Sequence, residues 1–340
     1  MNPTESLVQY MTDVRRSLHQ TPELAWEEVA TADWIRGRLT ELGIPWRAVA
    51  GTGTVATLMP AEIRGPHVAF RADMDALPIQ EATGLPFASR CPGIMHACGH
   101  DGHMAALLGT ANWMKQHELD LLGPVSFVFQ PAEEGGHGAR RILEEGGLEG
   151  VDEIYGWHNW PALPLGKALC PDGTVMSGNG TFRITVHGKG GHASQPEAAR
   201  DPVLAAAALT LNLQQIVSRR LPPQAKVVVS VTSVDGRSSP TIIPGQVVLE
   251  GSFRFSEPQW RSVIEDLLRE ISEHTAAGYG VRAEVELFPR YGATVNHPSS
   301  AAGYREALGA EFGDGFDQTD LLLPIMASED FSYYLNQLPG

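Results

Sequence analysis

The stretch that decides the fold is residues 125–136, VSFVFQPAEEGG, in which a short β-rich run ends at a proline and two glutamates follow. We expect a strand over 125–130. The chain around it alternates, because helical patterns cover 101–117 and 138–145 and a further strand covers 154–158. Alternating strands and helices are typical of an α/β domain with a mostly parallel sheet flanked by helices. The sequence predicts that fold class for this part of the chain.

The residues before this stretch extend the same domain. Apolar residues at helical spacing predict a helix over 6–18 and a second one over 22–42, with Thr21 as its N-cap. Two β-rich runs, 54–59 and 67–71, predict two more strands of the sheet.

A different pattern begins near residue 180. Strand, helix, two strands, helix and strand are expected over 181–187, 201–219, 226–232, 247–255, 260–275 and 283–288. This β-α-β-β-α-β order is the ferredoxin-like unit, a compact sheet with helices on one face. Because such a unit can close on itself, we expect an inserted domain over 180–289. The first domain is then discontinuous and consists of 1–179 and 290–340.

Composition excludes several classes of partner. The 340 residues carry 25 basic and 40 acidic side chains, a formal net charge of −15, which disfavours nucleic acid and anionic membrane surfaces. Three cysteines do not make a disulfide scaffold and fit a reducing cytoplasm. No apolar run is long enough to span a membrane. We therefore expect a cytoplasmic protein without a membrane segment.

Residues 95–103, MHACGHDGH, hold the densest set of metal-ligand types in the chain. Cys98 and His100 lie two apart at the expected start of a helix, so both side chains can converge on one ion. Thiolate, imidazole and carboxylate are ligands that borderline metals such as zinc take. The alternative is structural: Cys98 packs as a small apolar side chain and Asp101 caps the helix. The density of ligand types favours the metal site.

Two adjacent carboxylates, Glu133 and Glu134, follow the expected strand 125–130. One of them can bind a metal while its neighbour acts as a general base. The alternative is an acidic loop that begins the next helix, where carboxylates are favoured by the helix dipole. Open α/β sheets bind ligands at the carboxyl ends of their strands, which favours the first interpretation.

Two other strand ends carry polar candidates. His158, in GWHNWP over 156–161, is either a ligand or a histidine packed among tryptophans. Asp73 and Asp75 follow the expected strand 67–71 and either orient ligand histidines or form a turn.

A glycine-rich segment in the expected inserted domain, GKGGHASQP over 188–196, holds His192. It lacks the Gly-Lys-Ser/Thr ending and the strand–loop–helix placement of a phosphate-binding loop. An exposed histidine on such a turn either reaches into a cleft between domains or is merely solvated.

Together these segments resemble the metal-dependent aminoacylase and carboxypeptidase family, and within it the amidohydrolase subfamily of hippurate hydrolases, indole-acetyl-amino-acid hydrolases and N-acetyldiaminopimelate deacetylases. The resemblance covers nearly the whole chain, from the motif at Arg15 to the one at Phe331. It implies a hydrolase that cleaves the amide bond of an N-acyl amino acid with two divalent metal ions, which are manganese, zinc, cobalt or nickel. It also implies that 180–289 is a lid through which the protein forms a homodimer.

The same resemblance implies roles for single residues. The implied metal ligands are Cys98, His100, Glu134 and His158; the implied catalytic residues are Glu133 as general base and His192 as oxyanion donor; the implied substrate contacts are Arg254 and Asn296.

The chain departs from the family pattern at two places. Thr241 stands where the family has asparagine, and the chain stops at Gly340, whereas family members continue into a strand, a helix and a further histidine ligand. We therefore expect either a C-terminally truncated chain or a protein that lacks one ligand. A dipeptidase or carboxypeptidase of the same family and a catalytically silent binding protein remain the alternative functions.

Overall fold

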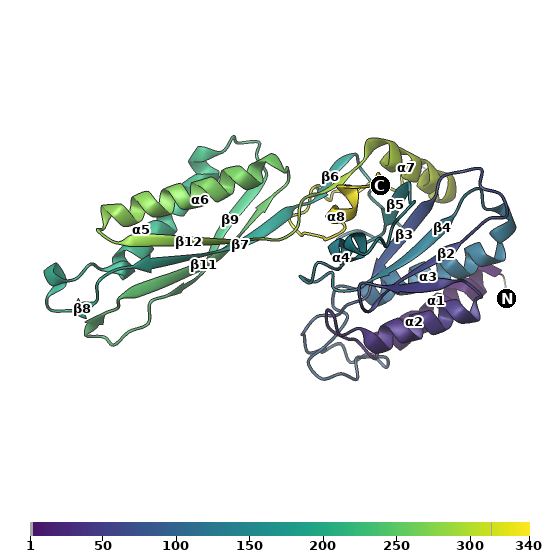
Figure 1. The fold of residues 1–340 in the computed structure, drawn as a ribbon, viewed down its shortest axis with the longest axis horizontal. Coiled ribbons are helices and arrows are strands. Elements are labelled where there is room, and N and C mark those ends of the chain that lie inside the picture. Colours follow the sequence, from purple (N-terminus) through teal and green to yellow (C-terminus); the bar gives the residue numbers. More distant parts are fainter. Residues whose placement is uncertain (1–2, 314) are drawn as a thin grey trace. The chain divides into compact units, whose positions relative to one another are not determined.

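The computed structural model describes residues 3–313 and 315–340, and these residues form two compact units (Figure 1). Unit 1 contains the chain up to Gly173 together with 296–321 and 330–340. Unit 2 contains 174–295 and 322–329.

Unit 1 is built on a five-stranded sheet in the order β1-β2-β4-β3-β5. Its strands are β1 (Trp46–Val49), β2 (Gly53–Leu58), β3 (Val68–Asp73), β4 (Val125–Gln130) and β5 (Glu153–Gly156). Strand β3 pairs in parallel with β4 and β5, whereas β2 pairs antiparallel with β4 and β1, so β2 alone runs against the other four. The predicted α/β class with a mostly parallel sheet is confirmed.

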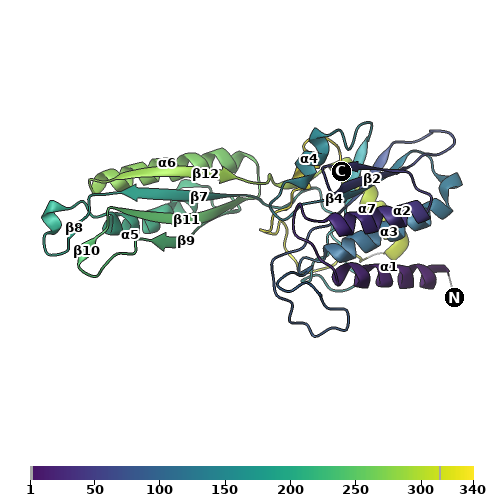
Figure 2. The same cartoon turned by 60° about the horizontal axis from the view of Figure 1, so that its bottom comes forward.

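Helices cover both faces of this sheet, and the side chains of β4 explain why. Phe127 and Phe129 pack in one apolar core, with side chains of α1 (Pro3–His19), α2 (Val29–Glu41) and α3 (His100–Gln116). Figure 2 shows these three helices together. Val128, which points to the opposite face, packs with α4 (Gly138–Glu144) and α8 (Ser332–Leu335). Helix α7 (Pro298–Phe312) completes the unit.

The helix predicted over 22–42 begins only at Val29, so the prediction of Thr21 as its N-cap is wrong. The carboxylate of Glu23 accepts hydrogen bonds from the backbone N–H groups of Ala30 and Thr31, at 3.1 and 2.8 Å, and so satisfies the first turn from outside the helix. Trp26 has φ +68°, a left-handed conformation that a helix cannot contain. Residues 22–28 therefore form an irregular segment with a turn before α2.

Unit 2 holds a four-stranded antiparallel sheet in the order β12-β7-β11-β9. The strands are β7 (Gly178–His187), β9 (Val227–Asp235), β11 (Gln246–Phe255) and β12 (Arg282–Pro289). Helices α5 (Pro202–Leu213) and α6 (Gln259–Gly278) pack against each other (Figure 1). Leu249 and Phe253 of β11 lie with side chains of these helices in one core. This is the β-α-β-β-α-β unit that the sequence predicts. The long helix expected over 201–219 is interrupted, because α5 ends at Leu213 and Ile216–Arg220 forms a π-helical turn.

Two short two-stranded sheets were not predicted from the sequence. Strand β8 (Gly191–His192) pairs with β10 (Ile242–Ile243), and β6 (Gly173–Met176) lies beside β13 (Thr294–Asn296). Among the residues that the structure describes, no helix has the length and apolarity needed to cross a membrane.

Candidate metal centre and active site

The carboxyl ends of β3, β4 and β5 lie at one edge of the unit 1 sheet, where α/β proteins bind ligands. Asp73 is the last residue of β3, Glu133 follows β4 by three residues, and His158 follows β5 by two. His100 is the first residue of α3. Before it stands Gly99 with φ +92°, where a Cβ would come within 2.7 Å of the Asn159 side chain. Glycine is therefore required where the chain turns into the site.

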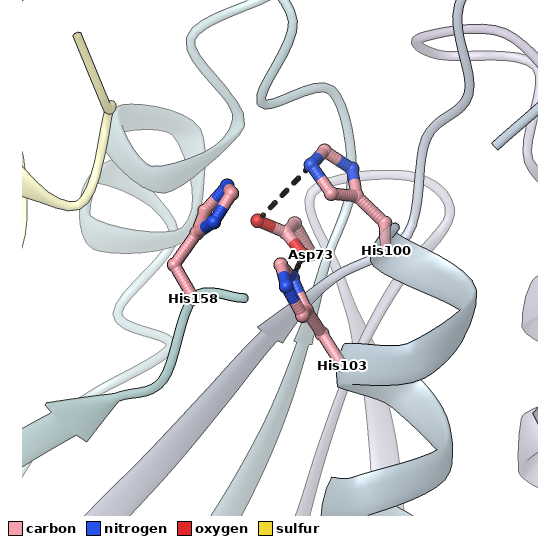
Figure 3. Close-up of side chains that lie close together, drawn as sticks. All are labelled: Asp73, His100, His103 and His158. Carbon is pink, nitrogen blue, oxygen red and sulfur yellow. Dashed lines mark hydrogen bonds and ion pairs between the residues drawn. The ribbon is translucent and has the colours of Figure 1, made fainter. Parts of the chain in front are cut away.

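Two groups of ligand-type side chains converge here. One ligand atom each of Cys98, His100 and Glu134 lie within 4.8 Å of one another. A second group with the same spacing is shown in Figure 3 and consists of Asp73, His100, His103 and His158. His100 belongs to both groups, so the two positions share one imidazole.

The ring of His100 indicates that the first group suits a divalent metal ion. Its Nδ1 donates a hydrogen bond to the backbone carbonyl of Asp75 at 2.8 Å, so a neutral ring presents the lone pair of Nε2 to the cluster. That Nε2 is buried and lies 3.5 Å from Asp73 Oδ2, but it makes no hydrogen bond to any described residue. A buried polar atom without a partner is costly, and ligation of a metal satisfies it. Sulfur, nitrogen and carboxylate donors together fit a borderline metal such as zinc.

The electrostatics of the site favour a positive charge. Burial alone lowers the pKa of His100, but the Asp73 and Asp75 carboxylates outweigh it and raise that pKa well above its ordinary value. Burial raises the pKa of the Cys98 thiol and of the Glu134 carboxyl. These two groups therefore hold protons more tightly than usual until a cation takes the protons' place.

Asp75 connects the ligand groups to one another. Its carboxylate accepts the backbone N–H of Glu133 at 2.9 Å and that of Glu134 at 2.8 Å, while its own carbonyl binds His100. One buried aspartate thus sets the position of both glutamates and of one imidazole. An orienting residue makes contacts of this kind, and the orienting role of Asp75 stays a prediction.

Asp73 is held between a cation and a histidine. Its Oδ2 accepts from Arg71 Nη1 at 2.7 Å, and its Oδ1 lies 2.6 Å from His103 Nδ1. Burial raises the pKa of Asp73, but Arg71, followed by His100 and His103, lowers it well below its usual range. Asp73 is therefore ionised at neutral pH.

His103 was not among the candidates chosen from the sequence. It lies three residues after His100 on α3, the spacing that places two side chains on one helix face, and this signal was available. Both of its ring nitrogens are engaged, Nδ1 with Asp73 and Nε2 with Asn159. His103 therefore contacts Asp73 as a supporting side chain.

The loop that carries Glu133 and Glu134 has left-handed backbone at both ends, with φ +52° at Ala132 and φ +61° at His137. Glu28, which is fully buried, accepts the N–H of Ala132 at 2.8 Å and the hydroxyl of Thr52 at 2.7 Å. Backbone conformations of this kind are costly and persist only where neighbours fix them, as they do here.

The remaining candidates lie outside these two groups. His192 is exposed on β8 in unit 2, with Nδ1 2.7 Å from the Ser194 hydroxyl. Arg254, on β11 of unit 2, donates to the carbonyl of Met326 at 2.6 Å. Asn296, at the end of β13, donates to the carbonyl of Pro171 at 3.0 Å. The predicted roles of these three residues stay predictions.

Comparison with known proteins supplies the family. The model of peptidase family M20/M25/M40 matches residues 69–340. The chain is 41% identical to an N-acetylcysteine deacetylase of Bacillus subtilis (strain 168), over 97% of this chain and 86% of that protein. It is 39% identical to the IAA-amino acid hydrolase ILR1-like 5 of Arabidopsis thaliana, over 99% of this chain and 78% of that protein.

A solved structure agrees with these relatives. The YXEP protein of Bacillus subtilis, described as a dinuclear metal binding peptidase from the M20 family, superimposes with a TM-score of 0.86. Its sequence is 38% identical, and the match covers 99% of this chain and 88% of that one. The chain therefore belongs to peptidase family M20/M25/M40, as an enzyme of the amidohydrolase subfamily that its sequence motifs predict.

Proposed function

We propose that this enzyme hydrolyses the amide bond of an N-acyl amino acid and releases a carboxylate and a free amino acid. The observation that carries the proposal is the convergence of Cys98, His100 and Glu134, with the buried carboxylate of Glu133 next to Glu134 in the chain. A carboxylate in that position can act as a general acid and base. Relatives named as an N-acetylcysteine deacetylase and an IAA-amino acid hydrolase support the substrate class.

We propose further that Cys98, His100, Glu134 and His158 hold two divalent metal ions, with Asp73 and Asp75 orienting them. The name of the Bacillus subtilis neighbour, a dinuclear metal binding peptidase, supports the number of ions. When bound, such ions supply Lewis acidity, which polarises an amide carbonyl and acidifies water. Manganese, zinc, cobalt and nickel all suit this donor set, and the choice among them is part of the proposal.

In the proposed mechanism Glu133 accepts the proton of the attacking water and returns it to the leaving amine. Its burial supports this role, because a buried carboxylate transfers protons to the substrate without competition from bulk solvent. The backbone N–H of Asp330 donates to Glu133 Oε1 at 3.2 Å and holds the carboxylate in one orientation.

The roles of unit 2 are proposals of the same kind. We propose that His192 donates a hydrogen bond to the carbonyl oxygen as negative charge develops on it. Residues 180–289 then act as the lid and as the surface of a homodimer, and Arg254 and Asn296 contact the substrate. A cytoplasmic location remains the prediction made from composition.

Metal analysis paired with a hydrolysis screen tests the function. The purified chain is loaded with manganese or zinc and assayed on N-acetyl, N-benzoyl and N-indoleacetyl amino acids, and on dipeptides, with a chelated sample as the control. We expect metal-dependent release of free amino acid from at least one N-acyl series. Hydrolysis of dipeptides alone would favour the peptidase alternative, and no hydrolysis by the folded, metal-loaded chain would refute the proposal.

A further inference from the structure

We propose that Asp330 is a positioning residue that fixes the Glu133 carboxylate and, through Arg71, the Asp73 carboxylate. The inference rests on the general-base role proposed for Glu133. It gives a purpose to the side chain of Asp330 in the motif Ser328-Glu329-Asp330-Phe331, because the proposed mechanism uses only the backbone N–H of that residue.

The side chain of Asp330 is fully buried and accepts hydrogen bonds from three elements of unit 1. Arg71 Nη2 of β3 donates to Oδ1 at 3.1 Å, and the backbone N–H of Ala139 of α4 donates to Oδ2 at 2.9 Å. Gln130 Nε2, at the end of β4, lies 2.8 and 2.9 Å from the two oxygens. Residue 330 is thereby fixed at the edge of the sheet where the ligand groups lie.

The backbone of Asp330 is what reaches the catalytic loop. Its N–H donates to Glu133 Oε1 at 3.2 Å, so the anchored side chain decides where that donor lies. A carboxylate that receives one fixed donor loses rotational freedom. A general base gains from this, because misplacement by about 1 Å costs on the order of a hundredfold in rate.

Arg71 connects Asp330 to Asp73, which lies in one of the two groups of candidate metal ligands. The guanidinium is buried and donates Nη2 to Asp330, Nη1 to Asp73 at 2.7 Å and Nε to Gln130 at 2.7 Å. Because the fork is rigid, its bond to Asp330 sets the plane in which it meets Asp73. The hydroxyl of Tyr334 closes the network by donating to Gln130 Oε1 at 3.1 Å.

Replacement of Asp330 by asparagine tests this reading with little change in shape. Each of the contacts above comes from a donor, so an amide group placed there turns its NH₂ toward either Arg71 or Ala139. We expect kcat to fall by about a hundredfold while KM, and the bound metal per chain when metal is supplied in excess, stay near those of the parent enzyme. Asp120→Asn, on the exposed turn Glu118–Asp120 of unit 1, is the matched control and should retain full kcat.

Two comparisons separate positioning from mere stability. Ile264→Ala lowers stability in the core of unit 2 and touches neither carboxylate, so its folded fraction should keep the parent kcat. If Asp330→Asn does not fold, Arg71→Lys is the second variant, because a single ammonium cannot hold Asp73 and Asp330 with a fork. Unchanged kcat in the folded, metal-loaded variant would overturn the inference.

A crystal structure of Asp330→Asn gives a readout that needs no activity. We expect the Glu133 carboxylate to be displaced or to occupy a second rotamer; an unchanged carboxylate would overturn the positioning role. If the parent enzyme instead proved inactive on all N-acyl amino acids, the proposed function would fail, while this structural readout would still decide the inference.

Discussion

The two units differ in what their interiors contain. The interior of unit 1 holds ionisable side chains in numbers, among them Glu28, Arg71, Asp73, Asp101 and Asp330. Unit 2 buries one carboxylate among its described residues, that of Glu329, and its buried polar side chains within 174–295 are serine, threonine and asparagine. Protein interiors normally exclude charge because it must be paired at a cost. The contrast indicates that unit 1 bears the desolvation cost of a polar site, whereas the interior of unit 2 is stabilised mainly by apolar packing.

Glu133→Gln tests whether a buried carboxylate of unit 1 takes part in catalysis. The amide keeps the shape but accepts no proton, so kcat should fall by about 10²–10⁴-fold while the bound metal stays unchanged. Substrate turnover and metal content of the same sample check it. Glu286→Gln, on the exposed edge strand of unit 2, is the matched control and should have no effect. Substantial activity in Glu133→Gln would exclude its role as general base.

Ile264→Ala tests whether the apolar core of unit 2 contributes to stability without affecting the metal site. Ile264 is fully buried in the apolar core of unit 2, and its truncation should lower the free energy of unfolding by about 2–5 kcal/mol. Denaturant titration measures the loss, and metal content of the folded protein should not change. If the fully folded variant lost bound metal, the core of unit 2 would also be needed for metal binding, which would contradict the comparison of the two units.

Cys98→Ser tests whether the thiol is a ligand or a packed apolar side chain. Loss of the sulfur should weaken metal binding by at least about tenfold to a hundredfold, as measured by competition with a chelator. Cys91→Ser, in the same loop and outside both ligand groups, is the control. Equal metal affinity in the two variants would favour the structural alternative.

A last test is the pH dependence of metal binding. The pKa values of Cys98 and His100 are raised, so near neutral pH both groups hold protons that a metal must displace. Affinity should therefore rise with pH, by about tenfold per unit for each proton displaced. Chelator competition at pH 6, 7 and 8 measures the slope. A flat profile would mean that the ligands are already deprotonated.

Features that depend on neighbouring residues in the chain, such as strands and the polar residues that follow them, could be predicted from the sequence. Apolar runs such as 125–130 mark the strands, and the polar residues at their ends, Glu134 and His158, lie at the sheet edge where α/β folds bind ligands. The start of α2 was missed because Glu23 caps it from outside the helix. The contact of Asp330 with Arg71 could not be predicted from the sequence, because 259 positions separate the two residues and only the three-dimensional fold brings them together.

That separation has a consequence for how the protein is made. The network that fixes Glu133 and Asp73 joins β3, β4 and residue 330, so it cannot close until residue 330 has left the ribosome. Cys98, His100 and Glu134 emerge much earlier and lie on elements that already contact one another. A growing chain can therefore gather metal-binding groups long before it holds a fixed general base, which separates metal capture from catalytic competence in time.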